Sequence, residues 1–215
     1  MSFVDYVAGN FEIISFLLLQ HLQVVLLAVG LATAISVGVA IGTERSPRAR
    51  SALLAVSGTI LTIPSFALFG LLIPVFGLGV APTILALTVY AIFPILRNTV
   101  TGLEHVDSAV IDAARGMGMS SGRLLRIVRL PLAWPVILNG IRVATIMTVA
   151  IAAIGAAVRG PGLGELIFRG LARMGGANAL NETLSGVVAI VAVALLLDVL
   201  FVLIGKITTP RGLHA

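Results

Sequence analysis

The 215-residue sequence has no cysteine and very little charge. Without cysteine, the chain cannot form disulfides or thiolate metal sites. Only 11% of the residues are charged, against roughly 25% in average soluble domains, while 59% are hydrophobic and the mean hydropathy is +1.13. This composition excludes an ordinary soluble domain and indicates an integral membrane protein.

Lysine is almost absent as well, since one lysine and thirteen arginines face nine acidic residues. A pI near 11.0 is typical of nucleic-acid-binding proteins, but here membrane topology explains the arginines better than a basic groove does. The first 44 residues carry no Lys or Arg, so the positive start of a cleavable signal peptide is missing. We expect a multi-pass membrane protein that contacts lipid and does not bind nucleic acid.

The sequence also lacks a recognisable catalytic set. Its three histidines are isolated, and none has a partner suited to metal binding or general-base chemistry: His21, His105 and His214. The only lysine, Lys206, is followed by Ile207, so there is no G-x-x-x-x-G-K-[ST] loop to hold ATP phosphates. We predict no catalytic residue and no metal site, and any ATP hydrolysis must come from another chain.

Long uncharged runs predict five membrane crossings in one domain, residues 1–215. A helix needs about 20 apolar residues to cross about 30 Å of hydrocarbon. A short interfacial helix is expected within 3–16, and the run 51–96 is long enough for two crossings joined by an outer turn at Gly77, Gly79 and Pro82. The other crossings are expected within 13–43, 134–158 and 184–205. The predicted fold class is an all-α membrane protein.

The distribution of basic residues sets the expected orientation. Ten of the fourteen fall on one side of this layout, including Arg45, Arg97, Lys206 and Arg211, and three fall on the other: Arg159, Arg169 and Arg173. Because Lys and Arg are enriched in cytoplasmic loops, we expect the N-terminus outside the cell and the C-terminus in the cytoplasm.

The basic segment 104–131, between the third and fourth crossings, has the clearest local pattern. Polar residues at 107–108 and at 120–121 can cap two short helices, and glycines at 116 and 118 loosen the backbone between them. Three arginines in the second helix are spaced to share one stripe: Arg123, Arg126 and Arg129. Pro131 is expected to end that helix because proline has no N–H to donate.

The same segment resembles the E-A-A-x3-G-x9-I-x-L-P signature of membrane subunits of binding-protein-dependent ABC importers. The matching residues are Asp112, Ala113, Ala114, Gly118, Val128, Leu130 and Pro131, with Asp for Glu and Val for Ile at two positions. The resemblance implies that this segment, with Arg115 and Gly116, forms a coupling helix that docks on the ATPase subunit. The alternative is an ordinary basic, amphipathic cytoplasmic loop.

A second resemblance involves TIPSFALFGLLIPVFGLG (62–79) and the stretch 90–120, which are similar to permeases of osmoprotectant importers. It covers about residues 17–206 and implies a type I ABC importer (MetI-like) transmembrane domain in a bacterial cell membrane. The implied substrates are glycine betaine, choline, carnitine or proline betaine. The implied partners are a second permease subunit, identical or paralogous, two ATPase subunits that bind ATP and Mg, and an extracytoplasmic substrate-binding protein.

Prolines inside the crossings point to a substrate path. Pro64, Pro74 and Pro94 each remove a backbone hydrogen bond that lipid cannot replace, so the turns around them should face protein or a water-filled path. The candidate lining residues are Pro64, Ser65, Phe66, Phe69, Tyr90 and Asn98. The alternative is a kinked helix packed against its neighbours.

Two ionisable residues, Arg142 and Asp198, fall within the predicted crossings. Their offsets from the cytoplasmic ends of their helices are similar, so one hypothesis is an ion pair between the fourth and fifth crossings. The alternative is that Arg142 snorkels to the interface and Asp198 faces a wet cavity.

Other functions remain open at this level. An importer of amino acids or another small solute would share the coupling segment. A gated channel could use polar Asn98, Thr99 and Thr101, and an intramembrane enzyme is the weakest alternative. The glycine-rich outer segment 159–183 resembles a turn and short helix where the binding protein docks, and a plain interfacial loop helix is the alternative.

Overall fold

The computed structural model describes residues 1–209, and every regular element within this range is a helix. Three single helices are long and apolar enough to cross a membrane, α2 (Phe11–Gly42), α5 (Val80–Glu104) and α10 (Ala179–Thr208), and so is the continuous helical stretch 121–158, which contains α8 (Leu130–Ile154). A further apolar pair, α3 (Pro47–Leu61) and α4 (Ser65–Phe76), is bent by 98° at its break, as in a broken span or a re-entrant loop. Arg211 and His214 lie outside the described residues.

The interfacial helix is shorter than the expected range 3–16. α1 (Phe3–Gly9) begins with a capping box, in which Ser2 and Asp5 each accept from the other's backbone N–H. It ends at Asn10, whose side-chain amide donates to the Tyr6 carbonyl at 2.8 Å. α2 starts immediately afterwards, so the first crossing begins near the expected position.

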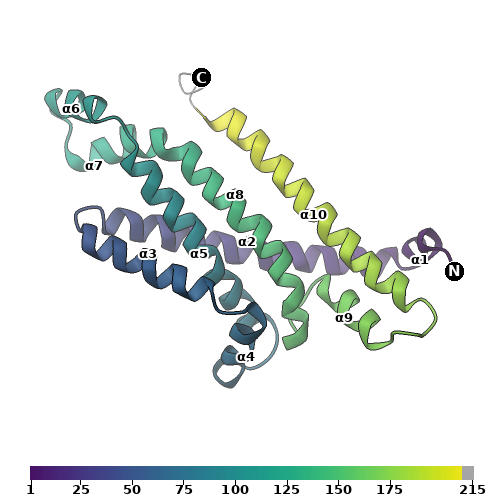
Figure 1. Cartoon of the computed structure of the whole chain (residues 1–215). Helices are drawn as coiled ribbons and strands as arrows, with labels where there is room; N and C mark the ends of the chain where they lie inside the picture. Colours follow the sequence, from purple (N-terminus) through teal and green to yellow (C-terminus); the bar gives the residue numbers. More distant parts are fainter. Residues whose placement is uncertain (210–215) are drawn as a thin grey trace.

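The core lies where α2, α5 and α8 pack together, with α10 beside α8 (Figure 1). Glycines let α5 and α8 approach closely. A Cβ on Gly140 would lie 2.6 Å from the Asn98 Cβ, and one on Gly102 would lie 3.0 Å from the Ala133 carbonyl oxygen. Contacts this short exclude any larger residue without movement of the backbone.

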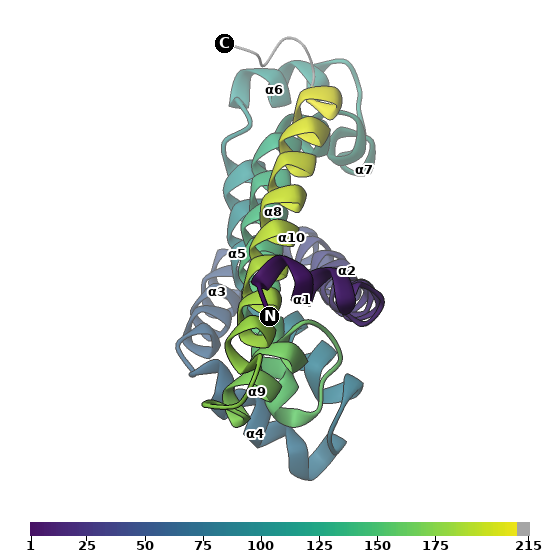
Figure 2. The ribbon, with the colours of Figure 1, turned by 90° about the vertical axis from the view of Figure 1, so that its right-hand side faces the viewer.

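The short helices gather at two ends of the bundle. α6 (Ser108–Gly116) and α7 (Ser121–Leu124) lie at the end where α10 finishes, whereas α4 and α9 (Gly164–Ala172) lie at the opposite end (Figure 2). The N-terminus lies beside the start of α10, because the Asn181 amide donates to the Met1 carbonyl at 3.1 Å. The N-terminus therefore lies near the start of α10, and the end of this 30-residue helix lies far from it.

The expected outer turn between α4 and α5 is present but shorter than predicted. Gly77 and Gly79 have φ values of +72° and +108°, which only glycine adopts readily. The Gly79 N–H donates to the Val158 carbonyl at 2.8 Å, at the end of the 3-10 helix η2 (Gly155–Val158). Pro82 lies inside the first turn of α5 instead, where a proline is tolerated.

Pro131 does not end the second helix of the basic segment, as the sequence predicted. α7 continues through the π-helical turn η1 (Leu125–Arg129) into α8, so the helix runs without a break from Ser121 to Val158. The Leu130 N–H donates to the Leu125 carbonyl, five residues earlier, and Pro131 then falls in the first turn of α8. Because the helix is continuous there, Pro131 leaves one carbonyl of the preceding turn without a backbone donor, and this gap falls next to the widened π-helical turn.

Candidate coupling surface and translocation path

α6 is a nine-residue helix fixed at both ends by local hydrogen bonds. The Asp107 carboxylate accepts from the Ala109 N–H at 2.8 Å and caps the first turn. At the other end Gly118 has φ +79°, and the Met119 N–H donates to the Ala114 carbonyl at 3.2 Å. The glycine spacing of the signature therefore supplies the left-handed residue that ends the helix.

The signature residues of α6 divide between an outer and an inner face. Ala114 is 2% exposed and anchors the helix, which rests on α7 and η1. Asp112, Ala113, Arg115 and Gly116 are exposed. Large apolar side chains are exposed on and around α6: Val110, Met117 and Ile127. α6 is thus a short, anchored helix with an uncovered, partly apolar face at one end of the bundle.

The Asp112–Arg115 ion pair is loose, with 3.5 Å between Oδ1 and the nearest guanidinium nitrogen, and both side chains are largely exposed. An exposed pair of this kind contributes at most about 1 kcal/mol to stability. Both charges therefore stay accessible to a partner.

The second half of the signature connects α6 to the bundle. Leu130 packs against a core cluster of α2, α5 and α8, Val128 is half-buried and Pro131 is exposed. The expected arginine stripe is not formed, because the π-helical turn changes the rotation between residues 126 and 129. Arg123 and Arg126 are exposed, whereas the Arg129 side chain is only 15% exposed.

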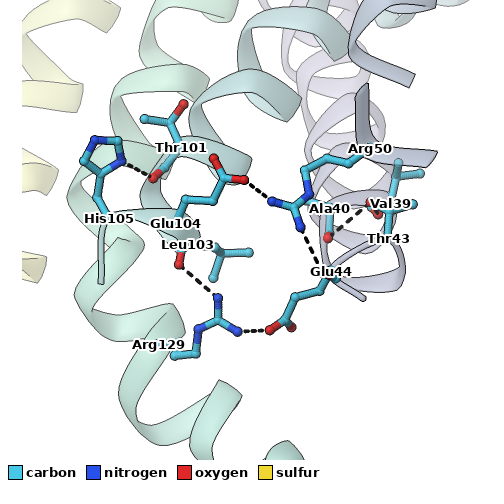
Figure 3. Close-up of polar contacts among 10 residues, drawn as sticks. All are labelled: Val39, Ala40, Thr43, Glu44, Arg50, Thr101, Leu103, Glu104, His105 and Arg129. Carbon is cyan, nitrogen blue, oxygen red and sulfur yellow. Dashed lines mark hydrogen bonds and ion pairs between the residues drawn. The ribbon is translucent and has the colours of Figure 1, made fainter. Parts of the chain in front are cut away.

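Arg129 belongs to an ionic group that we call the inner cluster, formed by Glu44, Arg50, Glu104 and Arg129 (Figure 3). Arg129 pairs with Glu44, and Arg50 pairs with Glu104. The sequence placed all four residues in segments on the same side of the membrane, but nothing in their spacing predicted that they meet. Their contacts depend on helix packing.

The candidate path residues separate into exposed and buried groups. Pro64 and Phe66 are exposed at the break between α3 and α4, with Phe66 at 64%, and Ser65 is half-buried. Tyr90 is buried, and its hydroxyl donates to the Ile63 carbonyl at 2.7 Å, so it stabilises the break. Phe69 is fully buried against Ala86 and Val158 and adds no surface to a path in this chain.

Asn98 is half-buried beside Gly140 and uses its side-chain amide within its own helix, donating to the Pro94 carbonyl at 2.8 Å. Pro94 leaves α5 continuous, and Pro74 likewise lies inside α4. Of the three prolines, only Pro64 therefore marks a broken helix.

Arg142 and Asp198 form the ion pair proposed from the sequence. Arg142 Nε lies 2.6 Å from Asp198 Oδ1, and a second guanidinium nitrogen lies 2.7 Å from Oδ2. This bidentate geometry connects α8 to α10. The snorkelling alternative is wrong, because the guanidinium of Arg142 is occupied by the carboxylate.

A second ionic group lies at the opposite end of the molecule, on the glycine-rich outer segment. Arg169 of α9 pairs with Glu182 of α10 and lies 3.3 Å from Glu165. Burial raises the pKa of the nearby Tyr6 phenol, and the Glu182 carboxylate adds to the rise. α9 is the short helix expected there. In and beside it, Leu163 and Leu166 are buried, whereas Leu171 and Met174 are exposed.

Known proteins are similar to this chain in sequence and in fold. The family described as "Binding-protein-dependent transport system inner membrane component" matches residues 34–212. The osmoprotectant import permease protein OsmW of Salmonella typhimurium is 36% identical over 219 residues, which cover 100% of both chains. The glycine betaine/carnitine/choline transport system permease protein OpuCB of Bacillus subtilis is 32% identical over 195 residues, 91% of this chain and 88% of that protein.

Among solved structures, an inward-facing form of the MetNI methionine ABC transporter superposes with a TM-score of 0.80. The sequence identity is 24%, and the match covers 94% of this chain and 99% of the transporter chain. This likeness concerns the fold, and it confirms the predicted type I importer transmembrane domain.

Proposed function

The chain belongs to the family of binding-protein-dependent transport system inner membrane components, and on that premise we propose that it carries quaternary-ammonium osmoprotectants such as glycine betaine, choline or carnitine. The names of relatives at 32–36% identity over nearly the whole chain support this substrate class. The uptake step is transport, without a covalent reaction in this chain.

We further propose that two ATPase subunits, which bind ATP and Mg, dock on α6. The observation that carries this proposal is the anchored helix with an uncovered outer face at the end of the bundle. A short helix with exposed Ala113 and Gly116 lets a partner approach closely, and the free charges of Asp112 and Arg115 add polar contacts at the rim. ATP hydrolysis is thereby assigned to the partner chains.

We propose two further partners, a second permease subunit and a binding protein. α10 has only 17% of its most apolar window buried within this chain, so lipid or another subunit must cover the rest. A second permease subunit, identical or paralogous, completes the translocation path, and an extracytoplasmic binding protein delivers the solute. We propose that this protein docks on the outer end with α9, and that the N-terminus lies outside the cell and the C-terminus in the cytoplasm.

The break between α3 and α4 is our candidate for part of the path. Its exposed Pro64 and Phe66 lie where the helix is interrupted. The aromatic ring of Phe66 can attract a quaternary ammonium group by cation–π contact. The proposed role of this surface is weak, transient contact with the solute.

The test is uptake by the complete complex, with the chain, its ATPase, its second permease and its binding protein reconstituted in proteoliposomes. We expect ATP-dependent accumulation of labelled glycine betaine or choline that unlabelled carnitine reduces. Accumulation of an amino acid in place of these solutes would transfer the chain to the other importer class. Flux without ATP would favour the channel alternative.

A further inference from the structure

The inner cluster joins three junctions that are distant in sequence (Figure 3). Glu44 lies in the turn between α2 and α3, and Arg50 lies in the first part of α3. Glu104 is the last residue of α5, and Arg129 is the last residue of η1, directly before α8. One ionic group therefore contacts the ends of α2 and α5 and the root of the segment that carries α6.

The arginines also bind backbone carbonyls at these junctions. Arg129 donates to the Leu103 carbonyl at 2.9 Å, and Arg50 donates to the Glu44 carbonyl at 2.9 Å. The last carbonyls of a helix have no partner within the helix and form the negative end of its dipole. Arg129 thus caps the C-terminal end of α5 with one terminal guanidinium nitrogen, while the other terminal nitrogen pairs with Glu44.

The π-helical turn is what brings Arg129 to this position. Arg126, three residues earlier on the same helix, is exposed and makes no ion pair within residues 1–209. Arg129 is turned inward and its Nε is buried without a hydrogen-bond partner. Its two terminal nitrogens contact Glu44 and the Leu103 carbonyl, so the guanidinium is held between the α2–α3 turn and the end of α5.

Building on the proposed function, we propose that Arg129 is a positioning residue that transmits movement from the docking helix α6, through α7 and η1, to α2 and α5. α6 rests on α7 and η1, so a displacement of α6 by the ATPase moves the root of this segment. Arg129 connects that root to the α2–α3 turn through Glu44 and to α5 through the Leu103 carbonyl. The inner cluster makes the three elements move together.

The experiment separates ATP hydrolysis from solute uptake in the reconstituted complex. We compare Arg129→Gln and Glu44→Gln with the matched control Arg126→Gln, which removes an exposed arginine from the same helix. We expect the first two variants to lower solute moved per ATP by about tenfold, a size typical of coupling between sites. Hydrolysis should stay within about twofold of wild type, since a factor of two is a small change in free energy. The control should keep both activities.

The ratio of uptake to hydrolysis also tests the contact itself. The inference is overturned if Arg129→Gln or Glu44→Gln has the same ratio of uptake to hydrolysis as Arg126→Gln. Should Arg129→Gln fail to fold, Glu44→Gln decides on the same readout, because it changes a more exposed side chain.

The same data distinguish this inference from the proposed function. If the wild-type complex shows no ATP-driven uptake of any quaternary ammonium solute, the proposed function fails and the inference falls with it. If wild type is active and Arg129→Gln keeps a normal ratio, only the inference is overturned.

Discussion

Tyr90 shows how a single hydroxyl stabilises a helix break within the membrane. Its side chain is 3% exposed, and its hydroxyl donates to the carbonyl of Ile63, next to Pro64. Pro64 is the N-cap of α4 and cannot donate a backbone N–H. The hydroxyl therefore supplies a hydrogen bond that the interrupted helix does not make.

We expect Tyr90→Phe to destabilise the protein by about 1 kcal/mol, since it leaves a part-buried carbonyl without its donor. The matched control is Tyr6→Phe. Tyr6 is also buried, at 8% exposed, but its hydroxyl makes no hydrogen bond within residues 1–209. Thermal unfolding of the detergent-solubilised protein measures the loss of stability in each variant. Equal shifts for the two variants would contradict the role given to the Tyr90 hydroxyl.

At the scale of elements, the molecule places two nine-residue helices, α6 and α9, at opposite ends of the bundle. Each carries an exposed alanine, Ala113 on α6 and Ala172 on α9. We assign the ATPase to α6 and the binding protein to α9. This arrangement offers a test in which the same substitution is made at both ends.

Ala113→Arg should prevent stable association with the ATPase, because a long charged side chain on a close-packed helix face blocks approach of the partner. Ala172→Arg should leave association with the ATPase unchanged. Co-purification of the ATPase with the affinity-tagged chain measures both. The assignment of α6 as the docking helix fails if the two variants retain the ATPase equally, provided that both elute as folded protein in size-exclusion chromatography.

For the whole molecule, the distribution of charge predicts which end of the bundle faces the cytoplasm. α6, the inner cluster and the end of α10 share one end, and Arg159, Arg169 and Arg173 lie toward the other. Because basic residues favour the cytoplasmic side, the α6 end should be inside the cell.

The absence of cysteine makes this direction measurable without a modified background. Met117→Cys, after α6, and Met174→Cys, after α9, each replace an exposed methionine, 72% and 57% exposed respectively. In intact spheroplasts a membrane-impermeant maleimide should label only Met174→Cys, and permeabilised cells should label both. Labelling of Met117→Cys alone in intact cells would mean that the predicted orientation is reversed.

Hydropathy and local chemistry carried most of the fold prediction. Lipid cannot satisfy backbone groups, so long uncharged runs must form helices, and their number and order could be predicted directly. The cap at Asp107 and the left-handed Gly118 follow from neighbouring residues and were equally readable. The end of α1 at Asn10 and the continuation through Pro131 were not, because each depends on small backbone shifts at one turn.

The sequence by itself determined that this is a membrane protein of helical crossings with a basic segment of two short helices, because hydropathy and helix capping act between neighbouring residues. It also placed Arg142 and Asp198 at matching depths, but only the tertiary structure established their contact. The right-angled break at Pro64, the burial of Phe69 and the inner cluster around Arg129 were decided by helix packing. Such contacts depend on how far each helix is rotated about its axis, and a single π-helical turn is enough to change that rotation.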